Sequence, residues 1–206
     1  MRVKIYVEGG GDTNALKTKC RQGFSEFFRK AGLEGRMPRI VASGSRQAAY
    51  DDFCTALNKG GADEFIILLV DSEAPVAPNH GNAPWSHLKA RDNWDKPVQA
   101  TDDNAHLMVQ CMEAWFITDR ATLKAFFGQG FNENALPANP NVEEIPKQNL
   151  YAALDTASRN SQKGRYGKGR HSFDILSQID PTRIVAASPW VRRLIDTLRG
   201  KAGVTT

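Results

Sequence analysis

The first seventy residues alternate between strand-length apolar segments and longer segments with a helical apolar stripe. Residues 3–7 alternate apolar and polar side chains, and residues 38–42 form a second short apolar segment. Residues 65–70 are an unbroken apolar run, which is typical of a parallel strand buried on both faces. Between these strands, the pattern predicts helices from residue 12 or 13 to about 31 and over 46–58. This β-α-β-α-β order predicts an α/β fold with a parallel sheet flanked by helices.

Beyond residue 71 the pattern becomes less regular and richer in helical segments. It predicts, in chain order, a long loop with a short helix, a fourth strand, a helix, a second loop and two further helices: residues 72–104 with 85–91, then 106–110, 113–127, 128–147, 148–158 and 171–178. Pro181 and Pro189 indicate two more helix starts. We therefore expect an α/β core over residues 1–110 and a helical extension over 111–206, packed together in one globular unit.

Composition narrows the class of protein without deciding it. A chain of 206 residues fits one domain, and its 27 basic and 23 acidic residues give a net charge of +4. That charge permits a polyanionic partner but does not require one. The longest apolar run is far shorter than the ~20 residues of a membrane span, so no membrane association is expected. The three cysteines are far apart and form no CxxC pair, which argues against a zinc site or a disulfide framework and favours a reducing cytoplasm.

Acidic residues follow two of the predicted strands. Glu8 comes at the end of the first strand, and Asp71 and Glu73 come at the end of the third. Ligands of parallel sheets bind beyond the carboxyl ends of the strands, where neighbouring strands would bring these carboxylates together. Converging carboxylates need a cation, and an all-oxygen site suits Mg²⁺ or Mn²⁺. Each acid alone could equally be a turn former or a helix cap, so the metal hypothesis depends on their occurring together.

Two glycines and a basic segment are candidates for contact with phosphate. Gly10 and Gly11 follow Glu8, and their permissive backbone would let a phosphate approach the chain. A glycine-rich loop near the C-terminus carries basic side chains around Tyr166, a pattern suited to phosphates and to a stacked base. Its candidate residues are Arg165, Lys168, Arg170 and His171. The alternative is an ordinary solvated loop.

Further acids follow the fourth predicted strand. Glu113 and Asp119 are candidates for a second metal ion, but a spacing of six does not place both on one helical face. Glu113 is the better candidate because it lies nearest the strand end, and the alternative is an acid favoured by the dipole of a first helical turn. Arg46, near the start of the second predicted helix, is expected to lie at the surface, and the alternative is contact with phosphate.

Two segments resemble the signature motifs of a known domain. Residues 7–12 (Val-Glu-Gly-Gly-Gly-Asp) and 68–73 (Leu-Leu-Val-Asp-Ser-Glu) resemble the motifs of the Toprim domain. Bacterial primases, type IA and II topoisomerases and overcoming-lysogenization-defect nucleases share that domain. Residues 106–115 and 168–171 resemble an uncharacterised bacterial Toprim-like family whose genes often lie beside ABC-type ATPases. The similarity to that family covers nearly the whole chain, whereas the similarity to Toprim at large covers about the first 110 residues.

The resemblance implies a role for each acid and a class of function. Glu8 would act as general acid or base in strand breakage or joining, while Asp71 and Glu73 would hold Mg²⁺. The common Toprim motif is Asp-x-Asp, and Glu73 is one methylene longer, which would shift the metal or interpose a water. The implied function is Mg²⁺-dependent cleavage of DNA or RNA, as the effector of an ABC- or SMC-type ATPase in anti-phage defence. The alternatives are a non-catalytic subunit that binds nucleic acid or the ATPase, and an enzyme acting on nucleotides. The sequence predicts no oligomeric state.

Overall fold

A parallel sheet forms the centre of the protein. A computed structural model describes residues 1–61, 63–80 and 82–203. The described residues form a four-stranded sheet of order β2-β1-β3-β4, with every neighbouring pair parallel. Its strands are Arg2–Glu8 (β1), Arg39–Gly44 (β2), Glu64–Asp71 (β3) and Ala105–Met108 (β4). The prediction of an α/β protein with a parallel sheet flanked by helices is therefore confirmed.

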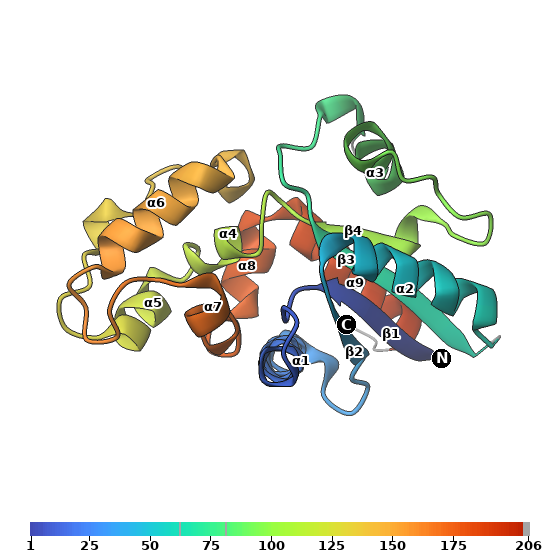
Figure 1. Cartoon of the computed structure of the whole chain (residues 1–206), viewed down its shortest axis with the longest axis horizontal. Coiled ribbons are helices and arrows are strands. Elements are labelled where there is room, and N and C mark those ends of the chain that lie inside the picture. Colours follow the sequence, from blue (N-terminus) through green and yellow to red (C-terminus); the bar gives the residue numbers. More distant parts are fainter. Residues whose placement is uncertain (62, 81, 204–206) are drawn as a thin grey trace.

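Helices cover both faces of the sheet and continue into a helical part at one end of the molecule (Figure 1). The α-helices that flank the sheet are Asn14–Phe28 (α1), Arg46–Lys59 (α2), Pro84–Asp92 (α3) and Pro189–Ala202 (α9). The remaining ones are Glu113–Phe116 (α4), Arg120–Phe127 (α5), Lys147–Ser158 (α6), Lys168–Leu176 (α7) and Pro181–Ala187 (α8). Three of the flanking helices begin with an N-cap whose side-chain oxygen accepts a hydrogen bond from a backbone amide of the first turn. The N-caps of α1, α2 and α9 are Thr13, Ser45 and Ser188.

Two apolar cores lie on opposite faces of the sheet. Alternate residues of β1 and β3 pack against α1 and α9 on one face, and those of β3 and β4 pack against α2 and α3 on the other. The first core continues into the helical part, where the Phe27 ring of α1 stacks on Trp115 of α4 at 5.2 Å between centroids. Because buried apolar area drives folding, this shared core fixes the helical part against the carboxyl ends of the strands.

The helical part differs in detail from the sequence prediction. The helix expected over 113–127 is two helices, because α4 ends at Phe116 and Asp119 starts α5 as its N-cap by accepting from Thr122 N at 3.2 Å. β4 ends two residues earlier than expected. α7 begins at Lys168 rather than at His171, so the last residues of the predicted basic loop are helical. Within the described part of the chain, no helix has the length and apolar character needed to cross a membrane.

Candidate functional site

Three carboxylates meet at the carboxyl edge of the sheet. Glu8 ends β1 and Asp71 ends β3, and these strands are hydrogen-bonded neighbours that pair Val7 with Leu69. Glu73 follows β3 and turns back with a positive φ of 65°. One oxygen atom from each carboxylate lies within 4.8 Å of the others. The structure thus brings together the three acids predicted from the sequence, and an all-carboxylate donor set fits a hard divalent cation.

Asp71 is the most deeply buried of the three, with 2 % of its surface exposed. Its Oδ1 accepts a hydrogen bond from Met112 N at 2.9 Å, and its Oδ2 lies 3.5 Å from both Lys147 Nζ and Lys168 Nζ. Burial raises the pKa of the Asp71 carboxyl, Lys168 opposes that rise, and the nearby Glu113 adds to it. Asp71 is therefore a buried acid whose charge depends on cations placed beside it.

Arg46 holds Glu8 from the other side of the site. Its Nη1 donates to Glu8 Oε2 at 3.1 Å and to the Asp71 carbonyl, and its Nη2 lies 2.7 Å from Asp92 Oδ2. The guanidinium also lies over the Trp94 ring, 5.0 Å from its centroid. Only 15 % of the Arg46 side chain is exposed. The expectation that Arg46 lies at the surface is therefore wrong, because both carboxylates it bridges are partly buried.

Glu73 is paired with basic side chains that sequence reasoning did not connect with it. Lys147 Nζ donates to Glu73 Oε1, and Arg91 Nη2 lies 4.0 Å from Glu73 Oε2. Burial favours a higher pKa for the Glu73 carboxyl, but the hydrogen bond from Lys147 and the neighbouring positive charges together outweigh it, so the pKa of Glu73 is lowered. Partial burial favours a lower pKa for the Lys147 ammonium group, but the charge of Asp71 and the pairing with Glu73 together outweigh it, so the pKa of Lys147 is raised. Lys147 is thus a member of the site that the sequence analysis missed.

Glu113 lies beside the carboxylate group rather than within it. It is fully buried at the start of α4, its Oε1 accepts from Tyr166 OH at 2.8 Å, and its Oε2 has no partner among the described residues. The three-carboxylate group does not include it, so the structure does not support Glu113 as a ligand of the same ion, and a role for Glu113 at a second ion stays a prediction. Burial raises the pKa of Tyr166, and Glu113 raises it further. The Tyr166 hydroxyl is thus engaged within the fold, and stacking of its half-buried ring on a nucleobase stays a prediction.

Comparison with known families then assigns the chain to one of them. Residues 7–199 match the family described as "Domain of unknown function (DUF4276)". The chain belongs to the DUF4276 family. No curated protein and no solved structure gives a match. The DUF4276 region contains every site residue named above, and its parallel sheet flanked by helices is consistent with a Toprim-like layout. The relation to Toprim proteins themselves stays a prediction.

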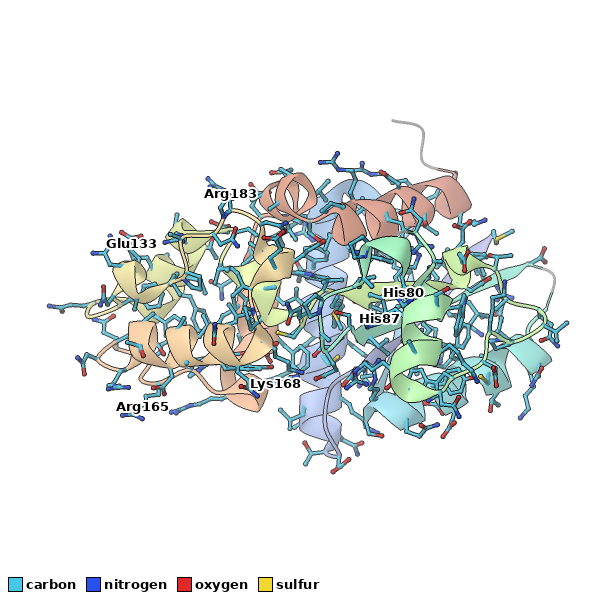
Figure 2. The ribbon with its side chains drawn as sticks, turned by 90° about the horizontal axis from the view of Figure 1, so that it is seen from above. His80, His87, Glu133, Arg165, Lys168 and Arg183 are labelled. Carbon is cyan, nitrogen blue, oxygen red and sulfur yellow. The ribbon has the colours of Figure 1, made fainter. Side chains whose placement is uncertain are left out.

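The predicted phosphate-binding residues of the DUF4276 chain occupy different positions. Lys168 reaches the carboxylates, whereas Arg165 is exposed, 3.7 Å from Asp155, and lies toward the outer end of the helical part (Figure 2). Arg170 is exposed. His171 is only 5 % exposed, and its Nδ1 accepts a hydrogen bond from Gly167 N at 3.2 Å. Lys168 therefore lies at the carboxylates and His171 is turned into the fold, and phosphate contact by the basic residues stays a prediction.

The two glycines predicted to contact phosphate also differ in their surroundings. Gly10 is buried with a φ of 87°, and an added Cβ would lie 3.0 Å from Lys17 Cα. Glycine at this position therefore permits the close approach of α1 to β1, and the structure does not support phosphate contact there. Gly11 is exposed with a φ of 51°, so phosphate contact at Gly11 stays a prediction.

Asp119, the weaker candidate for a second metal ion, has a structural role. It is 3 % exposed and accepts backbone hydrogen bonds from Thr122 N and from Asp180 N at 3.2 and 3.0 Å. These bonds join the start of α5 to the start of α8. Because both carboxylate oxygens already hold the fold together, Asp119 is not available to the site.

Proposed function

We propose that this DUF4276 protein cleaves phosphodiester bonds of nucleic acid with the aid of Mg²⁺ or Mn²⁺. The observation that carries the proposal is the meeting of Glu8, Asp71 and Glu73 at the carboxyl edge of a parallel sheet, within 4.8 Å of one another. The basic side chains beside them suit a substrate that carries phosphate groups. The resemblance to Toprim nucleases points to the same chemistry.

Each acid receives a role from its surroundings. Asp71 and Glu73 would hold the divalent cation, which supplies neutralisation of charge on the phosphodiester when bound. Both hydrogen bonds that the described residues donate to Glu8 end on Oε2, from Arg46 and from Asp71 N. Glu8 is thereby oriented by one oxygen, and its other oxygen would accept or return a proton at the attacking water or the leaving group.

Nuclease assays on plasmid DNA, single-stranded DNA and RNA with Mg²⁺ or Mn²⁺ test this function. We expect Glu8→Gln and Asp71→Asn each to reduce cleavage by at least about 100-fold. Glu64→Gln is the matched control, because Glu64 begins β3 at the opposite end of the sheet. Robust cleavage that survives both site substitutions would overturn the assignment of the site.

A second function is favoured by one specific observation. Each of the three carboxylates is already paired with a basic side chain: Glu8 with Arg46, Asp71 with Lys147 and Lys168, and Glu73 with Lys147. Such pairing suits a non-catalytic subunit in which the acids are structural or hold a metal without turnover, and the surface binds nucleic acid or an ATPase. Under this alternative, Asp71→Asn would abolish Mn²⁺ binding while nucleic-acid or ATPase binding persists, and the wild type would cleave nothing.

An ATPase of the ABC or SMC type is the partner that we propose, and a role in anti-phage defence follows from the same resemblance. The cleavage assay is therefore run both with the protein alone and together with an ATPase of this type encoded beside its gene. Cleavage only in the presence of the ATPase would support the partnership. Equal cleavage in both conditions would count against it.

A further inference from the structure

Two ammonium groups from the helical part converge on one oxygen of the core. Lys147 Nζ and Lys168 Nζ each lie 3.5 Å from Asp71 Oδ2, and Lys147 Nζ also pairs with Glu73 Oε1. Lys147 begins α6 and Lys168 begins α7, so neither belongs to the sheet that carries the acids. The Lys147 side chain is 20 % exposed and that of Lys168 is 52 % exposed. Asp71 therefore shares one oxygen between two cations that can reach solvent.

The backbone at Lys147 is fixed by Gln110, which is 3 % exposed. Lys147 N donates to Gln110 Oε1 at 3.3 Å, and Gln110 Nε2 donates to Glu143 O at 3.2 Å. The Gln110 carbonyl accepts from Glu73 N at 2.8 Å. The same buried amide residue thus ties the start of α6 to the backbone of a candidate metal ligand, and leaves the Lys147 side chain able to change partners.

The backbone at Lys168 is fixed in a similar way. His171 Nδ1 accepts from Gly167 N, and Ser172 Oγ donates to the Lys168 carbonyl. The His171 ring packs within 5.9 Å of the rings of Phe126 and Phe127, measured between centroids. His171 is therefore a positioning residue for the first turn of α7. The backbone position of Lys168 is therefore fixed, although half of its side chain is exposed.

A divalent cation on the carboxylates and the two ammonium groups would compete for Asp71. Both lysines carry their charge at neutral pH, since an ammonium group is ordinarily protonated there and each lies 3.5 Å from the Asp71 carboxylate. Like charges only a few ångströms apart repel, and a partly buried setting screens that repulsion less than bulk water does. The ammonium groups therefore weaken cation binding, and any ammonium group displaced from Asp71 needs another anion.

We propose that Lys147 and Lys168 are exchangeable counter-ions, which neutralise Asp71 and Glu73 before the cation binds and transfer to substrate phosphate oxygens afterwards. The proposal rests on the proposed function, since it concerns the same site. It predicts that removal of either lysine has opposite effects on two affinities. Cation binding should strengthen because a competing charge is lost, while phosphate binding should weaken because a partner is lost. A lysine that merely supported the acids would weaken cation binding on removal.

Direct binding measurements on Lys147→Met and Lys168→Met test this inference without relying on activity. Mn²⁺ binding in the absence of nucleic acid is followed by the paramagnetic signal of the free ion. Binding of a fluorescein-labelled single-stranded oligodeoxynucleotide in Ca²⁺ is followed by anisotropy. For each variant we expect the Kd for Mn²⁺ to fall by roughly three- to tenfold and the Kd for the oligonucleotide to rise by a similar factor.

Two further variants keep the comparison interpretable. Lys124→Met is the matched control, because Lys124 pairs with Glu133 in the helical part away from the carboxylates, and both affinities should stay at wild-type values. Lys168→Arg keeps the charge, so it should not strengthen Mn²⁺ binding. Circular dichroism checks that each variant is folded, and the half-exposed position of Lys168 makes its variant the decisive one if Lys147→Met does not fold.

The outcomes separate this inference from the function on which it rests. If Lys168→Met binds Mn²⁺ with the same affinity as the wild type or more weakly, the exchange is overturned, while the assignment of the metal site stands. Mn²⁺ binding that is absent in the wild type overturns both. Opposite shifts of the two affinities, with Lys124→Met unchanged, support the exchange whatever the cleavage assay shows.

Discussion

At the scale of single residues, the site depends on which side chain neutralises which carboxylate. Arg46 bridges Glu8 and Asp92, and the planar guanidinium can donate to both while it lies over Trp94. All three charged side chains are less than one-fifth exposed. Removing one partner of such a group leaves the others buried and unpaired, which costs more free energy than the ion pair contributes.

Replacement of Arg46 by Met should therefore be strongly destabilising. We expect Arg46→Met to lower the free energy of unfolding by about 3 kcal/mol, measured by urea denaturation. Arg29→Met is the control, because Arg29 forms an exposed ion pair with Glu26 within one turn, and it should leave stability nearly unchanged. Equal effects of the two substitutions would show that Arg46 is no more than a surface residue.

The residues of the site were predictable to different degrees. Glu8, Asp71 and Glu73 could be predicted because each follows a strand whose apolar pattern is local to the sequence. Lys147 could not, since it lies 76 positions from Asp71 and follows a proline-rich loop without a regular pattern. The contact between Lys147 and Asp71 arises from the way the helical part packs on the core. His171 was misjudged because a local charge pattern does not show that a ring turns inward.

At the scale of secondary-structure elements, β4 and α9 are joined by a buried polar contact. His106 of β4 is fully buried; Arg193 of α9 donates to its Nδ1 at 3.0 Å, and its Nε2 lies 3.1 Å from Asp103 O. This arrangement suits a neutral imidazole that donates from Nε2 and accepts at Nδ1. Burial, together with the charge of Arg193, lowers the pKa of His106 from 6.5 to about 3.

The contact predicts a dependence of stability on pH. As pH falls below about 6.5, the unfolded chain takes up a proton at His106 before the folded protein does. Stability is therefore lost as pH falls from about 6.5 toward 3, by up to about 1.4 kcal/mol per pH unit for this one group. Comparing urea unfolding of the wild type and His106→Gln isolates this contribution. We expect a shallower loss in the variant between pH 6.5 and 5, and identical slopes would contradict the prediction.

Elements differ in how far the sequence determines them. The strands and α2 were predicted closely because buried runs and the Ser45 cap are local signals. The helix expected over 113–127 was not, because its interruption depends on Asp119, which accepts bonds from both α5 and α8. A cap that also serves a distant backbone amide has no periodic signal in the sequence.

At the scale of the whole molecule, the candidate site is shared between two parts of the chain. The sheet supplies the carboxylates, and the first residues of α6 and α7 supply the ammonium groups. The relative position of the two parts depends on the packing of α1 against α7. The two helices pack closely at Gly23 of α1, because an added Cβ would lie 2.8 Å from Phe173 O and 3.1 Å from Phe173 Cβ.

A methyl group at Gly23 should push α7 away and move Lys168 with it. We expect Gly23→Ala to lower the free energy of unfolding by about 1–3 kcal/mol, as overpacking does, and to weaken oligonucleotide binding. Gly200→Ala is the matched control in helix α9, where nothing lies within 4 Å of the added Cβ. Replacing a glycine by alanine in an open helical position should raise the free energy of unfolding by about 0.5–1 kcal/mol. Destabilisation by Gly23→Ala beside stabilisation by Gly200→Ala, with oligonucleotide binding weakened only in Gly23→Ala, would support the α1–α7 contact as the feature that positions Lys168 relative to the acids. Changes of the same sign in urea denaturation, or unchanged oligonucleotide binding in Gly23→Ala, would contradict it.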